Sequence, residues 1–522
     1  MKGKILLLAM FALSFQVFSQ VKTEKVNPDQ IPQRIQKEGM RPISLTIPDE
    51  EVVLLELEES VLGANSENES FDFGRFFPFE LNFEIIESLC KDGKCFKEIE
   101  VEYGGMNTLG FVFDQLDLSK NAKFYLINDE AGYIQGPITR ESVNVPRGFI
   151  SGLMPGDRLR LLLEEPENEQ NTSIIRINEA SFGIFDFFNV SKYSSRLNSS
   201  NPCWGFGCSA SCNINIACTS SLDLESKAVA LVLIKNPSNN TYSIRGTGAL
   251  INNGYQDRKF LFITASHIYN SFEWDNNSQF VFHYKSLQCS PTTNGSLTIY
   301  VQGATNIIPT GQGHTDLKLV ELKVGSGGNP LFASNPVSFL GWSIIDELSV
   351  VQGIHHPRGD VQKLFTGTNV QVYNETIGTG NYNYWKFDLA SGVFEAVSSG
   401  SPILNVSKRL ISTIRGRVGG TPEFSCGGAN ENAIGGRISA SWPAFCQFLD
   451  PGNEGIVAIN TIPYSSGTSV KVFPSATGPN NVCTSGSFTL TNAPLDIPIS
   501  WEIIQGANLF SGSTSGSGKP QH

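Results

Sequence analysis

Residues 259–267 read Lys-Phe-Leu-Phe-Ile-Thr-Ala-Ser-His, an apolar run that ends in small residues and a histidine. A short apolar run bounded by polar residues is typical of a buried β-strand. A histidine directly after such a strand is held by a rigid scaffold, as a general base requires. His267 is therefore the first candidate functional residue.

Two later motifs carry the chemistry that a histidine base would serve. Asp316 opens the alternating run 317–322, and Ser399 lies in the small-residue segment Ser-Ser-Gly-Ser-Pro at 398–402. A serine hydroxyl becomes a nucleophile when an imidazole takes its proton, and a carboxylate orients that imidazole. The order His, Asp, Ser, with gaps of 49 and 83 residues, is the order found in the chymotrypsin-like double β-barrel. The three motifs together predict a catalytic triad of His267, Asp316 and Ser399.

Charge is spread unevenly over the 522 residues, whose net charge is −12. Such a balance argues against nucleic acid as a partner, since binding phosphates needs clustered Lys and Arg. Residues 21–200 carry 31 acidic and 18 basic side chains, whereas residues 201–522 carry 19 and 18. All six histidines lie in the second part. We therefore place the catalytic chemistry after residue 200.

The amino-terminal residues have the pattern of a signal peptide. Lys2 and Lys4 precede an apolar run from Ile5 to Phe15. This run is shorter than the roughly 20 residues that a membrane-spanning helix needs, and no later segment is long enough. We expect no membrane span and a secreted protein, with the cell surface and the periplasm as alternatives. Ten cysteines in an exported chain favour disulfides over metal ligands.

The fold class predicted is all-β, because short alternating runs are separated by turn residues throughout. The linker expected at 198–202 is rich in Ser and Asn. The sequence predicts four regions: a signal peptide at 1–19, an acidic arm and β-sandwich pro-region at 20–200, a double β-barrel at 201–450, and a linker with an incomplete immunoglobulin-like β segment at 451–522.

From Ser211 to about Trp442 the chain resembles the bacterial lysyl endopeptidases, a branch of the trypsin-like serine proteases. The shared text is CNINIAC, GTGALINN, TASH, DLKLVEL, GIHHP, SSGSPI and GRISASW. The resemblance implies the same triad and a zymogen whose preceding β-sandwich is a propeptide. By matching cysteines it also implies the disulfides Cys212–Cys426 and Cys218–Cys289.

Three departures from the family concern stability, specificity and catalysis. A disulfide beside the catalytic histidine is missing, because its two positions are Gly246 and Ile268; such a bridge contributes about 2–4 kcal/mol. The acidic residue behind lysine preference is replaced by Ala433, with Glu431 the only nearby acid. In the pocket wall, Arg415 stands where the family has a histidine. A pocket without a carboxylate does not favour an ammonium group, so lysine preference is not expected.

The third departure lies in the oxyanion hole, which the backbone N–H groups of residues 397 and 399 would form. The family has glycine at the first position, and this chain has Val397. A β-branched residue resists the positive φ that glycine adopts freely. A flipped peptide would remove one donor, at a cost of about 10²–10³ in rate.

The remaining cysteines and histidines have simpler interpretations. Cys90 and Cys95 are expected to close a local loop, and Cys203 and Cys208 a second one. Cys446 and Cys483 are left over, and their pairing stays open. His355 and His356 are neighbours that would point to opposite faces of a strand, so no metal site or other cofactor is predicted.

These patterns predict a serine endopeptidase acting on protein or peptide substrates through an acyl-enzyme, with its own pro-region as intramolecular inhibitor. The alternative is a catalytically impaired pseudoprotease that acts as a secreted binding or adhesion protein. Val397, the missing disulfide and the altered pocket favour that alternative.

Overall fold

The computed structural model describes residues 21–464 except 36–40, 48–49, 64–70, 144, 189–203, 270–274, 298, 309–314, 325–334, 347–349, 378–379, 420–423 and 429, together with four short strands beyond Tyr464. The predicted signal peptide, the linker at 198–202, Cys203 and Cys483 lie outside these residues. Within them, strands far outnumber helices, and the all-β prediction is confirmed.

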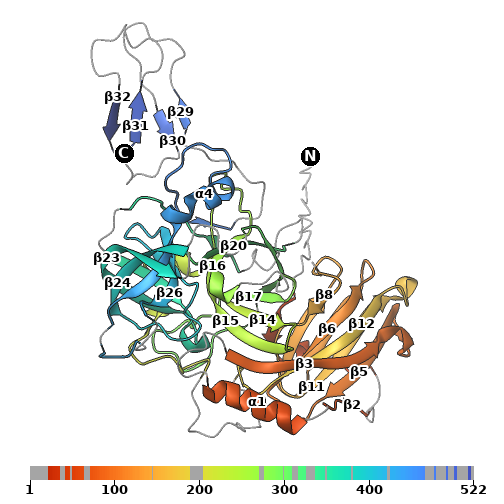
Figure 1. Cartoon of the computed structure of the whole chain (residues 1–522). Helices are drawn as coiled ribbons and strands as arrows, with labels where there is room; N and C mark the ends of the chain where they lie inside the picture. The colour runs from red at the N-terminus through yellow and green to blue at the C-terminus, as the bar shows by residue number, and fades with distance from the viewer. Residues whose placement is uncertain are drawn as a thin grey trace, which may run out of the picture.

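The amino-terminal region is a sandwich of two mainly antiparallel sheets (Figure 1). The first sheet contains β1 (Thr23–Lys25), β8 (Tyr133–Ile138), β7 (Lys123–Asn128), β11 (Arg158–Pro166), β5 (Lys94–Glu102), β2 (Ile43–Ser44) and β4 (Leu89–Lys91). The second contains β10 (Met154–Pro155), β9 (Phe149–Ile150), β6 (Thr108–Asp117), β12 (Ile174–Gly183) and β3 (Phe71–Asn82). Aromatic rings join the sheets, as where Phe113 meets Phe124 edge-on at 5.7 Å.

The acidic arm expected before the sandwich contributes to it. Strand β1 pairs with β8, and helix α1 (Glu50–Gly63) lies beside β3. Leu54 and Leu57 of α1 are buried in the sandwich core. Apolar residues within the arm thus dock it on the sheets despite its charge.

The first barrel follows, and its strands match the apolar runs read from the sequence. They are β14 (Val229–Asn236), β15 (Thr241–Leu250), β16 (Leu261–Ala265), β17 (Ser278–Phe282), β18 (Ile299–Gln302), β19 (Ala304–Asn306) and β20 (Leu317–Leu322). Seven of the eight residues of β14 are buried, because β15 and β17 flank it and both of its faces are covered.

The second barrel is a closed ring of six strands. Pairings run from β23 through β22, β25, β26, β27 and β24 back to β23. The strands are β22 (Val350–His355), β23 (Lys363–Ile377), β24 (Gly380–Ser391), β25 (Pro402–Leu404), β26 (Leu410–Arg417) and β27 (Ala433–Arg437), with β13 (Ile214–Asn215) added beside β23. The predicted double barrel is therefore present.

Smaller elements complete the described chain. Helix α2 (Asp223–Ser226) precedes β14, and helix α4 (Ile438–Leu449) follows β27. Strand β21 (Ser338–Phe339) pairs with β28 (Ile462–Pro463), and the segments beyond Tyr464 form two antiparallel pairs, β29 (Ser475–Thr477) with β30 (Thr489–Thr491) and β31 (Ile499–Glu502) with β32 (Ser515–Gly518). No helix in the described residues is long and apolar enough to cross a bilayer.

The sandwich and the first barrel share one sheet. Strand β3 pairs antiparallel with β15, Phe71 opposite Ile244 and Gly74 opposite Tyr242, so that the two strands run side by side in Figure 1. Phe73 packs on the Tyr242 ring at 4.6 Å, and Phe71 stacks on Trp204 at 4.5 Å. One hydrophobic core thus extends from the sandwich into the barrel.

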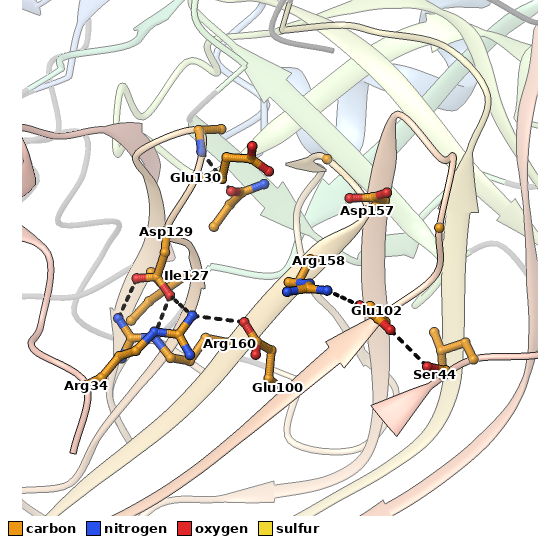
Figure 2. Close-up of a pocket in the computed structure, with 15 residues that line it drawn as sticks. Arg34, Ser44, Glu100, Glu102, Ile127, Asp129, Glu130, Asp157, Arg158 and Arg160 are labelled. Atoms are coloured by element: carbon orange, nitrogen blue, oxygen red, sulfur yellow. Dashed lines mark hydrogen bonds and ion pairs between the residues drawn. The ribbon is translucent and has the colours of Figure 1, made fainter. Parts of the chain in front are cut away.

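A charged pocket of about 680 Å³ lies on the sandwich and is lined by paired side chains (Figure 2). Arg34 bonds both Glu100 and Asp129, at 2.9 and 2.8 Å. Arg160 is 1% exposed, bonds Asp129 at 2.7 Å, and lies 3.7 Å from Glu98. The carboxylates of Glu98, Glu100 and Asp129 are thus paired with neighbouring guanidinium groups, which makes this network a structural part of the sandwich.

Replacing Arg160 tests how much this buried network stabilises the fold. Arg160→Ala removes the cation from the buried Glu98 and one of the two cations from Asp129, which keeps Arg34, and we expect the free energy of unfolding to fall by about 3–5 kcal/mol. The control is Arg176→Ala, whose pair with Glu84 is exposed to solvent, so that its loss should change the free energy of unfolding far less. Urea unfolding followed by tryptophan fluorescence measures both. Equal losses of unfolding free energy in the two variants would contradict the structural role assigned to the Arg160 network.

Candidate active site

His267 lies directly after the fully buried strand β16, in a single turn formed by Ser266–Ile268. Asp316 directly precedes β20, whose Leu317 pairs with Ala265 at the end of β16. The two strands therefore deliver the histidine and the aspartate to the same edge. The apolar runs of the sequence predicted these two strands, and the structure adds that they pair with each other.

The carboxylate of Asp316 holds both the ring and the backbone of His267. Its Oδ2 lies 2.6 Å from His267 Nδ1, and its Oδ1 accepts from the His267 backbone N–H at 3.0 Å. The Asp316 carbonyl also accepts from Ser266 N–H at 2.7 Å. A carboxylate bonded at Nδ1 leaves Nε2 as the nitrogen that can accept a proton.

Arg415 on β26 approaches the same carboxylate. Its Nε lies 3.3 Å from Asp316 Oδ2, the oxygen that meets His267. The sequence placed Arg415 in the wall of the specificity pocket, and the structure brings its guanidinium to the aspartate. The spacing along the chain gives no sign of this contact, because the two residues are 99 positions apart.

Ser399 lies in a loop fixed to β15 by Thr247. The Thr247 backbone N–H donates to the Ser399 carbonyl at 2.9 Å, and the Thr247 hydroxyl donates to the Val397 carbonyl at 2.9 Å. Gly400 follows at φ 82°, and a Cβ there would come within 2.2 Å of the Thr247 carbonyl. Only glycine fits, which explains the small-residue motif around Ser399.

The histidine and serine loops meet at Gly246. A Cβ on Gly246 would lie 2.3 Å from Ile268 Cδ1 and 2.8 Å from the Ser399 carbonyl. The two positions where the family has a disulfide are therefore neighbours in this structure. The Ile268 side chain is 1% exposed and fills the space that a Gly246 side chain would occupy. Packing replaces the covalent link beside His267.

Val397 adopts the conformation that its side chain resists. Its φ is 74°, and holding a non-glycine residue in this left-handed conformation costs on the order of 1–3 kcal/mol of folding free energy. The Val397 side chain is fully buried in the core shared by sandwich and barrel. The Ala396 carbonyl accepts from Arg358 N–H at 2.8 Å, so the Val397 N–H of the same trans peptide points away from Arg358. Burial and this bond hold the left-handed backbone.

Of the pair His355–His356, His355 contacts the loop that carries Ser399. His355 Nδ1 lies 3.0 Å from the hydroxyl of Ser398, and His356 Nδ1 lies 2.8 Å from the Asp360 carbonyl. Both rings are fully buried, and burial lowers the pKa of His355 to about 3 and of His356 to about 4. The sequence showed the pair, but nothing in it linked His355 to the residue before Ser399.

The residues assigned to the specificity pocket fall in different environments. Ala433 is fully buried at the start of β27, in an apolar cluster that contains Phe387, Phe394 and Phe424. Glu431 is exposed. The one acid near Ala433 in sequence is therefore not part of this apolar cluster.

The structure contains the disulfides Cys212–Cys426, Cys218–Cys289 and Cys90–Cys95. The first ties the start of the double barrel to the segment before β27, and the second ties it to the loop after β17. Cys208 is disulfide-bonded, and Cys203, its expected partner, lies outside the described residues. Cys446, whose pairing the sequence left open, has no disulfide partner among the described residues.

Comparisons with known proteins agree with these features. Residues 206–434 match the family model described as lysyl endopeptidase, C-terminal domain. The predicted resemblance to the lysyl endopeptidases is confirmed. A lysyl endopeptidase of Pseudomonas aeruginosa is 30% identical over 302 residues, which are 55% of this chain and 60% of that protein. The chain thus aligns with little more than half of that lysyl endopeptidase.

Two solved protease structures are similar to this chain at lower sequence identity than that relative. The active form of the Rv3671c protease from M. tuberculosis matches with a TM-score of 0.30 and 12% identity, over 49% of this chain and 91% of that one. The HtrA-type protease AlgW with a tripeptide matches with a TM-score of 0.30 and 14% identity, over 44% and 63%.

The buried histidines predict a loss of stability in acid. Between pH about 6.5 and 4 the unfolded chain protonates imidazoles that stay neutral in the fold, so the free energy of unfolding falls as pH drops. Each such histidine contributes a slope of up to about 1.4 kcal/mol per pH unit. The His356→Gln variant lacks one of these imidazoles, so its free energy of unfolding should fall less steeply as the pH drops, by up to about 1.4 kcal/mol per pH unit. Urea unfolding at pH 7, 6 and 5 measures this slope. Parallel curves for variant and parent would contradict this.

Proposed function

We propose that the chain is a secreted, trypsin-like serine endopeptidase made as a zymogen. The observation that carries the proposal is the 2.6 Å contact of His267 Nδ1 with Asp316, beside a nucleophile loop that meets the histidine loop at Gly246. The signal-peptide pattern supports export, and the family match supports the reaction class.

In the proposed reaction, Ser399 Oγ attacks the scissile carbonyl carbon while its proton passes to His267 Nε2. The carbonyl electron pair moves onto oxygen, which the backbone N–H groups of Val397 and Ser399 would stabilise. The pair then returns, the C–N bond breaks, and His267 gives its proton to the leaving amine. Water hydrolyses the resulting ester by the same steps and restores Ser399. Asp316 stabilises the imidazolium throughout.

The link between the two regions supports a zymogen. Trp204 stacks on Phe71 of the sandwich, whereas Gly207 N–H and the Ser209 hydroxyl donate to the buried Asp360, at 3.0 and 2.7 Å. Ala210 N–H donates to Glu395, two residues before Val397, at 2.8 Å. Cleavage in this segment would therefore alter contacts that reach the oxyanion loop. We infer that residues 20–200 restrain the protease as its pro-region.

Covalent labelling tests the nucleophile. A fluorophosphonate should phosphonylate the parent protein at Ser399, with loss of fluoride, because the histidine base activates that hydroxyl, and Ser399→Ala should abolish labelling. His267→Ala should slow labelling by at least about 10³-fold. Peptide mapping by mass spectrometry locates the adduct, and Ser398→Ala is the matched control. A parent protein that never labels, beside a reactive control protease, would favour the pseudoprotease alternative.

Specificity is the second test. Ala433 lies among phenylalanine rings and Glu431 is exposed, so a lysine side chain at the residue before the scissile bond would lose water without gaining a carboxylate. We expect peptide-library cleavage to show kcat/KM for lysine no higher than for apolar residues of similar size. A lysine preference of tenfold or more, about 1.4 kcal/mol, would contradict this assignment.

A further inference from the structure

Three strands of the first barrel, β14, β17 and β18, are apolar on both faces. One set of alternate residues belongs to the core of the barrel: Ala230, Val232, Ile234, Phe280, Phe282, Ile299 and Val301. The residues between them belong to the core of the sandwich: Leu231, Leu233, Val281 and Tyr300. Because successive side chains of a strand point to opposite faces, the sandwich covers the outer wall of this barrel.

The covered side chains form rows across the wall. Leu231 lies opposite Val281, and Val281 lies opposite Tyr300. Tyr242 and Ile244 of β15 belong to the same core. An antiparallel sheet with one face in water carries polar residues on that face, whereas these side chains are at most 5% exposed. The wall is therefore built to be covered.

Removing the sandwich would expose this apolar wall to water. Each large apolar side chain contributes about 1.5–3 kcal/mol when it is buried. The six named on the wall then contribute on the order of 10 kcal/mol, before the entropic cost of holding two separate chains together is subtracted. Burial on this scale is typical of permanent contacts between chains, which are more hydrophobic than transient ones.

Buried hydrogen bonds give the same contact its specificity. The Gln302 side chain accepts from the Ile150 N–H and donates to the Gly148 carbonyl, both at 2.8 Å. The Tyr300 hydroxyl accepts from the Gly152 N–H at 2.8 Å. Each bond joins a barrel side chain to the backbone of the sandwich. Separation would have to replace all three with bonds to water.

Backbone pairing and an ion pair extend the contact. Strand β3 pairs with Thr241–Ile244 of β15, and Arg75 of β3 donates to the Asn239 carbonyl at 2.6 Å. Lys235 of β14 lies 2.6 Å from Glu179 of β12, and the Lys235 side chain is 8% exposed. Apolar, polar and backbone contacts therefore all join the two regions without the covalent link between them.

The covered core also reaches the candidate active site. Val397 belongs to the same cluster, and burial of its side chain offsets the strain of its left-handed backbone. The Val397 carbonyl accepts from the hydroxyl of Thr247, on the strand that pairs with β3. Uncovering this core would weaken the packing that holds Val397, whose N–H is one donor of the proposed oxyanion hole.

We propose that the sandwich stays bound to the double barrel after the link between them is cut, so that the mature protease consists of two chains. The docked sandwich keeps the core around Val397 closed. Cleavage then relieves the restraint locally, in the link, and releases no propeptide. This inference goes beyond the proposed function and rests on it only for the cleavage of the link.

The test uses the full chain with a recognition sequence for a specific protease in place of residues 193–198, which lie outside the described residues. Each described disulfide, and the one expected between Cys203 and Cys208, lies wholly on one side of this cut. The cut protein is passed through a size-exclusion column at about 10 μM and at about 10 nM. We expect both fragments to elute together at the mass of the uncut protein, and to separate only in urea.

Two variants weaken the contact, and a third is the matched control. Val281→Asp places a carboxylate on the covered wall, so its cut fragments should separate in native buffer. Gln302→Ala leaves the backbone groups of Ile150 and Gly148 without this partner, and should raise the dissociation constant by about tenfold or more. Val372→Asp makes the same substitution at an exposed position of β23 and should behave as the parent.

Labelling with the fluorophosphonate measures the effect on the active site. The cut parent, with its sandwich bound, should be labelled at Ser399 at least as fast as the uncut protein. Separated fragments of Val281→Asp should be labelled about 10²-fold more slowly or worse, the cost of one oxyanion donor. Equal labelling rates before and after separation would overturn the support assigned to Val397.

The outcomes for this inference and for the proposed function differ. Parent fragments that separate at about 10 μM in native buffer overturn the inference, and labelling of the released barrel at Ser399 then leaves the function standing. Fragments that elute together but are never labelled, cut or uncut, overturn the function and support the docking of the sandwich.

Discussion

Thr247 holds the nucleophile loop to strand β15 through its backbone amide and its hydroxyl group. Every other part of the site is placed relative to that strand. β16, which ends two residues before His267, pairs with β15 beyond Thr247, and β3 of the sandwich pairs with β15 before it. The sandwich, the segment that carries His267 and the loop that carries Ser399 are therefore all attached to one strand. The β3 pairing ends at Ile244, three residues along β15 from Thr247, which holds the loop that carries Ser399.

Backbone strain in the site is concentrated at two positions to which the proposed mechanism assigns roles. Asp316 and Val397 both have positive φ, 59° and 74°, where ordinary residues are disfavoured. Each is held by surrounding bonds: Asp316 by His267 and Ser266, and Val397 by Thr247 at its carbonyl and by burial of its side chain. The sequence suggested that valine would resist this backbone. The structure shows Val397 in that conformation. The burial of its side chain in the apolar core offsets the cost of the strained backbone.

The sequence was sufficient to predict the strands around His267 and Asp316, because local alternation and apolar runs depend on neighbouring residues. It did not reveal β3, where Gly74 and Pro78 interrupt the pattern and residues of both faces are buried, since the strand is shared by two domains. The contacts of Arg415 with Asp316 and of His355 with Ser398 were also missed. They join segments far apart in sequence, and no spacing rule places such side chains together.

The sandwich and the barrel share more than a backbone pairing, and this affects how a restraint could be relieved. Phe71, Phe73 and Tyr242 are buried in one core, with Val397 in the same cluster. Full separation would expose these rings, and each large apolar side chain contributes about 1.5–3 kcal/mol when buried. Opening the end of β3 nearest Ser399 exposes far less surface. The physical chemistry therefore favours local opening of one strand end over dissociation of the sandwich as the event that would relieve such a restraint.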